Sequence, residues 1–227
     1  MEKKVALVTG GSSDIAKAII KDLVKKNYYV YTTYNQTKIN YTDSNVVSLP
    51  CDLQKEEDIL MLCSVLQKKC KTIDLLICCA ALCQDNTIEE KTKDEFIRVL
   101  DVNVVSVFLL VKHLKNELVN SGGVVLFISS TDGIDTYNEY NIDYSVSKAA
   151  LIHLNKTLAY AIKDIKFYCL SLNFVDTKSI REMNPIFLEE ELKRVGQKKL
   201  LKPSEVSKKV FDILEKQEES GKNYILR

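Results

Sequence analysis

One pair of side chains in the sequence has the spacing expected of a proton-transfer pair. Tyr144 and Lys148 stand four residues apart in Tyr-Ser-Val-Ser-Lys, so both lie on one face if the segment is helical. A protonated lysine beside a phenol favours the ionised form and lowers the tyrosine pKa from about 10. The pair is therefore a candidate acid or base that gives a proton to a carbonyl oxygen or takes one from an alcohol.

This spacing alone is not specific, because the chain holds 11 tyrosines and is rich in lysine. A second match, Tyr34 to Lys38, follows a predicted strand and has no serine-bearing strand end before it. Tyr144 comes after residues 127–131, Phe-Ile-Ser-Ser-Thr, which read as a hydroxyl-rich strand end. Sites in parallel α/β sheets form at the carboxyl ends of strands, so the context selects Tyr144.

A turn of small residues lies between the first predicted strand and the first predicted helix. Thr9 and Gly10 are followed by Gly-Ser-Ser and then by Asp14-Ile-Ala at the helix start. Small residues let the backbone approach a pyrophosphate, and the helix N-terminus offers free N–H groups to it. The turn predicts nucleotide binding. A carboxylate there would repel phosphate, so we expect Asp14 to cap the helix.

These motifs, in this order, resemble the short-chain dehydrogenase/reductase family over nearly the whole chain, with its 3-oxoacyl-carrier-protein reductase-like members closest in look. The TGxxxGxG turn of that family keeps its first glycine as Gly10 and has Asp14 and Ala16 at the other two positions. Residues 78–81, Cys-Cys-Ala-Ala, take the place of its NNAG segment. Residues 173–177, Asn-Phe-Val-Asp-Thr, resemble the end of its PGxxxT segment.

The resemblance implies four catalytic residues. Tyr144 and Lys148 are the proton-transfer pair, and Ser130 orients the substrate carbonyl. Ser130 lies 14 residues before Tyr144, one more than the commonest family spacing; the usual count selects Thr131, which also carries a hydroxyl. The local SSxxG pattern favours Ser130. Asn103, within an apolar stretch, is implied to join a water-linked proton relay to Lys148.

The resemblance also implies a nicotinamide dinucleotide cofactor, with Asp52 facing its adenine; Asp52 equally suits the N-cap of a helix beginning near Gln54. NADP(H) is preferred over NAD(H). The end of the second strand has no Asp or Glu, while Asn35, Thr37 and Lys38 can donate hydrogen bonds to a 2′-phosphate. The expected cofactor contacts are Gly10, Ser12, Ser13, Asp14, Ile15, Tyr34, Asn35, Asp52, Leu53, Ala80, Tyr144, Lys148, Val175 and Thr177.

These residues require a scaffold of alternating strands and helices. Short apolar, β-branched runs predict strands at 5–8, 28–33, 46–49, 75–79, 124–129, 167–172 and 224–226. Amphipathic stretches predict helices at 14–26, 56–69, 93–120, 143–163, 189–199 and from 203 onward. The alternation predicts a Rossmann-type α/β fold, a doubly wound parallel sheet in three α/β/α layers. We expect one domain, 1–227, with a substrate lid at about 178–202.

Composition argues against several classes of protein. The chain has 227 residues, a formal charge of +1 and no basic block, so nucleic-acid binding is not expected. No stretch approaches 18 apolar residues, and the apolar run 5–8 is too short for a signal sequence; we expect no membrane association and a cytoplasmic location. Seven cysteines without a CxxC pair, and only two histidines, indicate reduced, mostly buried thiols and no metal site.

Together the patterns predict an NAD(P)(H)-dependent oxidoreductase that moves a hydride between a nicotinamide and a carbonyl or alcohol, on a small-molecule or acyl-thioester substrate. A 3-oxoacyl thioester is one candidate. Asp132, Asp135, Glu139 and Asp143 do not favour an acidic carrier protein, so a small polyol, sugar or keto compound stays open.

A protein of the same fold that senses dinucleotides or acts as a scaffold without catalysis is the alternative. A nucleophilic hydrolase is disfavoured because the chain lacks GxSxG. The resemblance implies a homodimer or homotetramer assembled through the helices at 93–120 and 143–163.

Overall fold

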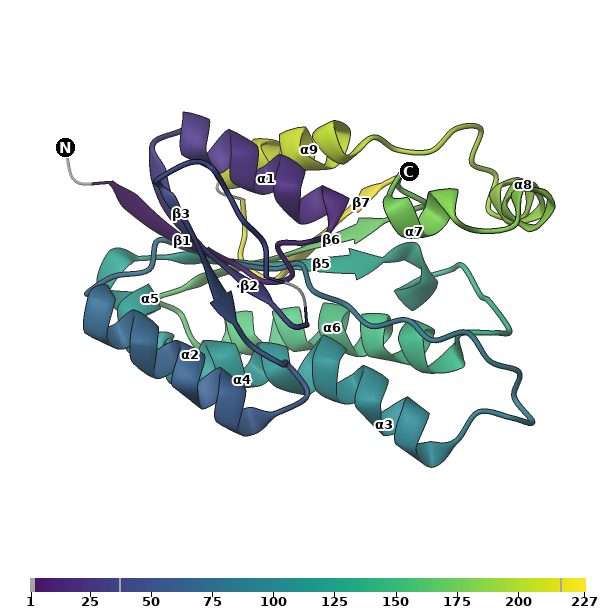
Figure 1. Ribbon diagram of the computed structural model, residues 1–227, viewed down its shortest axis with the longest axis horizontal. Coiled ribbons are helices and arrows are strands. Elements are labelled where there is room, and N and C mark those ends of the chain that lie inside the picture. The colour runs from purple at the N-terminus through teal and green to yellow at the C-terminus, as the bar shows by residue number, and fades with distance from the viewer. Residues whose placement is uncertain (1–2, 37, 217) are drawn as a thin grey trace.

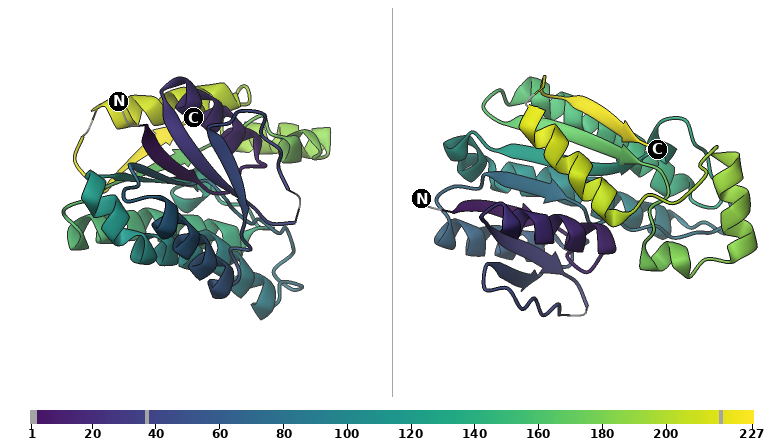
Figure 2. Two further views of the ribbon diagram at one scale, coloured as in Figure 1. Left: turned by 60° about the vertical axis from the view of Figure 1, so that its left-hand side comes forward. Right: turned by 90° about the horizontal axis from the view of Figure 1, so that it is seen from above.

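The computed structural model describes residues 3–36, 38–216 and 218–227. One sheet holds seven parallel strands in the order β3-β2-β1-β4-β5-β6-β7, with helices on both faces (Figures 1 and 2). The predicted doubly wound, three-layer Rossmann-type fold is confirmed. The strands are β1 Lys4–Val8, β2 Tyr28–Tyr34, β3 Val46–Pro50, β4 Leu75–Cys78, β5 Val124–Ser130, β6 Lys166–Leu172 and β7 Lys222–Leu226.

The helices divide between the two faces of the sheet. In Figure 1, α1 and α9 lie on one face, and α2, α4, α5 and α6 lie on the other. Their bounds are α1 Asp14–Lys25, α2 Glu56–Lys69, α3 Lys93–Leu100, α4 Ser106–His113, α5 Lys115–Ser121, α6 Ile142–Ala161, α7 Lys178–Arg181, α8 Pro185–Arg194 and α9 Pro203–Lys216.

The strands are apolar along their length because both faces of the sheet are covered. In β1, Leu7 belongs to the core under α2, α4 and α6, while Ala6 and Val8 belong to the core under α1 and α9. All three side chains are fully buried. Successive residues of a strand point to opposite faces, so a strand with two cores shows no polar alternation.

The strand order reverses between β1 and β4. From β1 the chain proceeds outward to β2 and β3, and it then returns to place β4 on the other side of β1. The loops that leave β1 and β4 therefore diverge, and a crevice opens at the carboxyl ends of these two strands.

The helix predicted at 93–120 is interrupted. A five-residue π-helix, Asp101–Val105, separates α3 from α4, and Leu114 separates α4 from α5. The Ser106 hydroxyl donates to the carbonyl of Val102 at 2.6 Å, and the side chain of Asn103 is held outside the helix. Hydrogen bonds of this kind compete with the regular helical ladder, and the apolar periodicity does not reveal them.

The helix predicted at 189–199 is also displaced. The structure has a short α7, then α8 with Pro185 in its first turn, and α8 ends at Arg194. Gly196 follows with φ +68°, a left-handed conformation typical of the residue after a helix. Figure 2 shows α7 and α8 beyond the arrowheads of the strands, on the same side as the crevice.

Two further features concern the chain as a whole. In the part that the structure describes, no helix combines the length and the apolar character needed to cross a bilayer. All seven cysteines are free, and six of them are buried, with Cys83 exposed. The adjacent Cys78 and Cys79 lie at the end of β4 as packed core residues.

Candidate active site

A cleft of about 810 Å³ occupies the crevice at the carboxyl ends of the strands. It brings together Ser130 and all of the cofactor contacts that the resemblance implies, whereas Asn103 is not among the lining residues. These lining residues are Gly10, Ser12, Ser13, Asp14, Ile15, Tyr34, Asn35, Asp52, Leu53, Ala80, Ser130, Tyr144, Lys148, Val175 and Thr177.

The turn after β1 forms one wall of this cleft. Gly10 has φ +70°, and a Cβ on it would lie 2.8 Å from the Cα of Ala80. Its N–H donates to the hydroxyl of Thr33 at 3.0 Å, and the N-terminus of α1 follows at once. A turn of glycines and small residues that leads into a helix N-terminus lets backbone N–H groups approach a pyrophosphate. The residues present therefore fit a dinucleotide.

The expected role of Asp14 as the helix cap is wrong. Ser13 is the N-cap of α1, and its hydroxyl accepts from the N–H of Ala16 at 3.1 Å. The Asp14 carboxylate instead accepts from the N–H of Lys178 at 2.7 Å and pairs with Arg181 at 3.0 Å. Residues of α7 therefore compensate the negative charge of Asp14, and Ser13 is the residue that caps α1.

Asp52 is not a helix cap either. Its carboxylate accepts from the N–H of Gln54 at 3.1 Å, which closes a turn, and α2 begins only at Glu56 with Lys55 as its N-cap. Asp52 remains at the cleft, as expected for a residue facing the adenine.

The end of β2 lies beside it. Tyr34 and Asn35 line the cleft, whereas the exposed Lys38 is not among the residues that line it. Thr37 lies outside the described residues. Asn35 is therefore the only one of the three expected 2′-phosphate donors that the structure places at the cleft.

The phenol of Tyr144 stands near the start of α6, against the end of β5. Burial raises its pKa, and the neighbouring Cys83 and Asp132 act in the same direction. The hydroxyl of Ser130, a hydrogen-bond partner, acts in the opposite direction. The lowering of the tyrosine pKa expected from the sequence is not found.

Lys148 lies beside the phenol but is itself buried. Its ammonium nitrogen donates to the carbonyl of Ile128 at 2.9 Å and lies 5.2 Å from the centre of the Tyr144 ring. The side chain is buried, and burial lowers its pKa. The lysine is thus anchored to β5 beside the phenol ring. Burial disfavours its protonated form, just as it disfavours the phenolate of Tyr144.

The hydroxyl that faces Tyr144 belongs to Ser130. It accepts from the N–H of Asp132 at 3.1 Å and caps the short 3₁₀ turn that begins at Thr131. Thr131, the residue selected by the usual family spacing, is 1% exposed and donates to the side chain of Asn173 at 3.1 Å. Both residues line the cleft, but of the two hydroxyls it is that of Ser130 that is a hydrogen-bond partner of Tyr144.

The side chain of Asn103 is hydrogen-bonded to Leu82 and Ser147. Its amide oxygen accepts from the N–H of Leu82 at 2.7 Å, and its amide nitrogen donates to the Leu82 carbonyl and to the Ser147 hydroxyl, both at 2.9 Å. These contacts occupy both N–H groups of an amide that is 1% exposed. The side chain braces the loop after β4 against α6, and its part in a water-linked relay to Lys148 stays a prediction.

The last two expected residues sit at the other wall. Val175 is buried and pairs with Leu201 in an isolated bridge, and the Thr177 hydroxyl lies 3.1 Å from that of Ser179. Both residues follow β6 and line the cleft where α7 begins.

Some residues of the site are not evident from the sequence. Asp132 lines the cleft beside Ser130, and burial raises the pKa of its carboxyl. Lys91 and Asp143 form a buried ion pair directly behind Tyr144. The sequence prediction includes Asp132 and Asp143 only as acidic charges that disfavour a carrier protein, and Lys91 carries no signal in the sequence.

Comparison with known proteins agrees with this geometry. Residues 4–185 match the model of a family described as short chain dehydrogenase. The 3-oxoacyl-acyl-carrier-protein reductase FabG of Buchnera aphidicola subsp. Acyrthosiphon pisum is 29% identical over 224 residues, which cover 95% of this chain and 91% of that protein. Glucose 1-dehydrogenase 2 of Bacillus subtilis is 29% identical over 222 residues, which cover 90% and 84%.

Among solved structures, the RhlG/NADP active-site complex of Pseudomonas aeruginosa superposes with a TM-score of 0.89 at 23% identity. The match covers 98% of this chain and 94% of that one. At this identity the likeness concerns the fold.

Proposed function

The chain belongs to the short-chain dehydrogenase family, and we propose that it uses Tyr144, Ser130 and Lys148 to reduce a carbonyl compound with a nicotinamide dinucleotide, or to run the reverse reaction. One observation carries the proposal. The phenol, the hydroxyl and the lysine meet in the same cleft as a glycine turn that fits a pyrophosphate.

When bound, the nicotinamide supplies or accepts the hydride. The chain itself must hold the carbonyl oxygen and manage its proton. The Ser130 hydroxyl can donate a hydrogen bond to that oxygen, and the Tyr144 phenol can give its proton as the oxygen gains charge. Since burial raises the pKa of Tyr144, the phenol stays protonated at neutral pH, which is the form required for reduction.

Lys148 has a separate role in this proposal. Its anchored ammonium lies beside the phenol ring and favours the phenolate that remains after proton transfer. Because the nitrogen already donates to the carbonyl of Ile128, its position does not depend on substrate.

The substrate class is open between two candidates, each with its own support. Sequence similarity to 3-oxoacyl-acyl-carrier-protein reductases favours a 3-oxoacyl thioester. Asp132 favours a carbonyl compound that bears hydroxyl groups, because its carboxylate lies at the cleft beside Ser130 and can accept hydrogen bonds from them. Of the four acidic residues considered for carrier-protein repulsion, Asp143 is fully buried and paired with Lys91, so it does not contribute to the surface.

We further propose that NADP(H) is preferred over NAD(H). Asn35 lines the cleft at the end of β2, and residues 32–36 and 38 include no Asp or Glu that would repel a 2′-phosphate. The competing proposal is a protein that binds the dinucleotide without catalysis. Measuring both cofactor binding and turnover separates an enzyme from such a protein.

The test compares wild type with Tyr144→Phe. Binding of NADPH and NADH is measured first, and turnover is then followed with 3-oxoacyl thioesters, hydroxyketones and aldoses. We expect Tyr144→Phe to bind NADPH as wild type does and to lose about 10²- to 10⁴-fold in kcat, because only the proton donor is removed.

Tyr160→Phe is the matched control, since Tyr160 lies on the same helix, α6, and is 81% exposed. Equal turnover by Tyr144→Phe would remove the tyrosine from its proposed role. Binding without turnover of any substrate by wild type would favour the non-catalytic proposal.

A further inference from the structure

A charged pair lies buried behind the proposed proton donor. The ammonium nitrogen of Lys91 is 3.0 Å from a carboxylate oxygen of Asp143, and the two side chains are only 5% and 0% exposed. Lysine and aspartate are seldom buried to this degree, because removing a charge from water is costly for each ion. The pair therefore calls for an explanation other than stability.

Asp143 ties this pair to Tyr144. It is the second residue of α6 and directly precedes the tyrosine. One of its carboxylate oxygens accepts from the N–H of Tyr144 at 2.9 Å, and the other meets Lys91. A single carboxylate thus fixes the backbone of Tyr144 and joins it to a residue 52 positions earlier in the chain.

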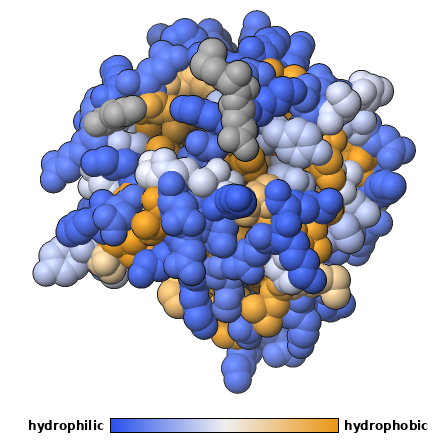
Figure 3. All heavy atoms as spheres, turned by 90° about the vertical axis from the view of Figure 1, so that its left-hand side faces the viewer, coloured by the Kyte–Doolittle hydropathy of each residue, from blue (hydrophilic) through white to orange (hydrophobic). Residues whose placement is uncertain are grey.

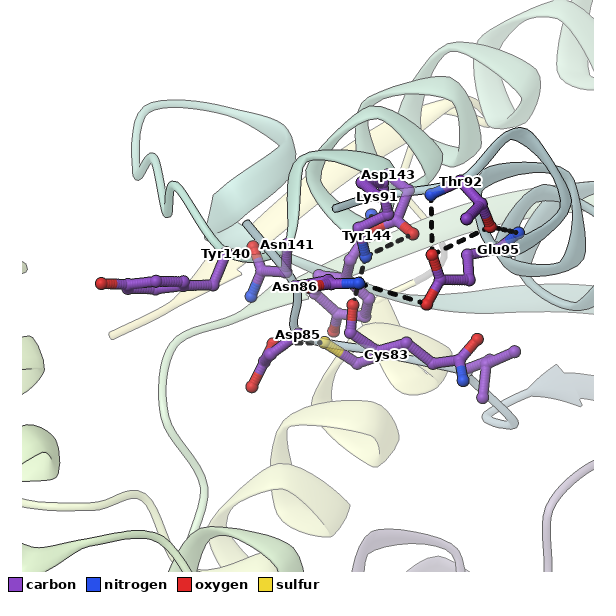
Figure 4. A network of polar contacts seen from close by, with 12 residues as sticks. Cys83, Asp85, Asn86, Lys91, Thr92, Glu95, Tyr140, Asn141, Asp143 and Tyr144 are labelled. Atoms are coloured by element: carbon purple, nitrogen blue, oxygen red, sulfur yellow. Dashed lines mark hydrogen bonds and ion pairs between the residues drawn. The ribbon is translucent and has the colours of Figure 1, made fainter. Parts of the chain in front are cut away.

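Lys91 ties the pair to the opposite wall of the cleft. Besides Asp143, its ammonium donates to the carbonyl of Gln84, in the loop between β4 and α3. In the same loop the N–H of Asn86 donates to the carbonyl of Tyr140 at 2.7 Å. Cys83 and Asp85, the neighbours of Gln84 in the chain, line the cleft. Figure 4 shows the loop residues and the start of α6 joined through this network.

The loop has a second fixed end. Thr92 caps α3, and its side chain and backbone exchange hydrogen bonds with Glu95 in a capping box. The amide nitrogen of Asn86 reaches the same glutamate at 3.4 Å. Lys91 is therefore held on a short segment anchored at the helix, which limits the positions that its ammonium can take.

We propose that Lys91 and Asp143 are positioning residues that lock the start of α6, and with it the phenol of Tyr144, to the loop that forms the facing wall of the cleft. The inference rests on the proposed function of Tyr144. Separating two buried charges in the folded protein is costly, so the loop and the helix start must move together. An apolar pair of similar size would pack in this place without fixing the direction of either side chain.

The first test separates positioning from stability. Lys91→Met leaves a buried carboxylate unpaired, and we expect it to lower the unfolding midpoint. The double variant Lys91→Met with Asp143→Asn removes both charges and keeps an oxygen that accepts from Tyr144. It should regain most of the midpoint, while its kcat stays about 10- to 100-fold below wild type and its Kd for NADPH is unchanged, because a small displacement of the phenol affects only the chemical step.

Lys208→Met is the control, because Lys208 pairs with Asp212 on α9 in an ion pair that is 77% and 41% exposed. A double variant that regains both midpoint and kcat would overturn the proposal. If wild type itself shows no turnover, the proposed function fails instead, and the second test still applies.

The second test needs no substitution or substrate. Hydrogen exchange of wild type should give the amides of Asn86, Tyr144 and Ser145 similar opening free energies, since the lock makes their segments open as one unit. Exchange of Asn86 more than about 10-fold faster than that of Tyr144 would show that the loop opens alone, and would overturn the proposed lock.

Discussion

At the scale of single residues, the acidity of Tyr144 depends on the groups that surround it. Burial is the largest cause of its raised pKa, and Cys83 and Asp132 add to the effect. Asp132 is itself buried enough for the pKa of its carboxyl to be raised, although the hydrogen bond that Thr136 donates to it and the neighbouring Ser130 hydroxyl counter this. The carboxylate and the phenol are thus coupled across the cleft, so the state of one changes the other.

Replacing Asp132 with asparagine should make Tyr144 more acidic. The negative charge of Asp132 opposes formation of the phenolate, so its removal lowers the tyrosine pKa. Reduction requires the phenol, so its loss of rate at high pH should begin at a lower pH than in wild type. Alcohol oxidation requires the phenolate and should gain rate at a lower pH. The measurement is the pH profile of kcat in both directions.

Asp135→Asn provides the control for this shift. Asp135 lies in the same loop, but it is half exposed and pairs with Arg227 at the end of the chain. An unchanged profile for Asp132→Asn would mean that its carboxylate is screened from the phenol.

If Asp132 also binds substrate hydroxyl groups, the same variant should lose kcat/KM for hydroxyketones and not for simple ketones, since it removes a charged acceptor.

At the scale of elements, α1 and α7 are joined at the mouth of the cleft. Asp14, in the first turn of α1, takes both the N–H of Lys178 and the side chain of Arg181 from α7. Arg181 also pairs with Asp176 at 2.8 Å. Together with Lys17, whose ammonium lies 3.9 Å from the carboxylate, these contacts compensate a negative charge that lies where the structure fits a pyrophosphate.

Arg181→Ala should therefore weaken cofactor binding by about twofold to fivefold, the range expected for an exposed ion pair. The loss should diminish at high ionic strength, because salt screens the repulsion between Asp14 and phosphate. Adding Asp14→Asn should restore affinity, since the repulsive charge is then absent. Titration of NADPH into each variant gives the Kd, and failure of the double variant to recover would indicate that Arg181 acts on α7 alone.

How far the sequence predicts these elements depends on the distance between partners. The strands and the place of Tyr144 were predictable, because apolar runs and the spacing from Tyr144 to Lys148 are local patterns. Asn103 with Leu82, Lys91 with Asp143 and Asp14 with Arg181 are 21, 52 and 167 positions apart. No periodicity reports such contacts, so the helix-cap role assigned to Asp14 from its own neighbourhood was wrong, and the contacts of Asn103 with Leu82 were not predicted.

The π-helix escaped prediction for a related reason. Residues 93–120 carry a continuous apolar pattern, which predicts one helix. The π-helix Asp101–Val105 contains Asn103, and the side chain of that residue braces Leu82 and Ser147. Only the tertiary structure supplies those two partners.

At the scale of the whole molecule, exposed apolar side chains are unevenly distributed. On the face shown in Figure 3, which is turned away from α8, hydrophobic residues form small patches separated by hydrophilic ones. Val105, Phe108 and Val146 are each more than 40% exposed, and they belong to the π-helix, α4 and α6. The π-helix packs against α6, so these side chains stand on neighbouring elements. These side chains lie within 93–120 and 143–163, the helices through which the family resemblance implies a homodimer or homotetramer.

Phe108→Lys combined with Val146→Lys should therefore shift wild-type oligomers toward monomers, because each substitution places a charge in an apolar contact. Light scattering after size-exclusion chromatography measures the mass of each species. Met61→Lys is the control, since Met61 is 66% exposed on α2, outside the predicted contact. Neither Phe108 nor Val146 lines the cleft, so the double variant should still bind NADPH. A wild type that is monomeric at micromolar concentration would contradict the predicted assembly and leave the apolar side chains of α4 and α6 without a role in it.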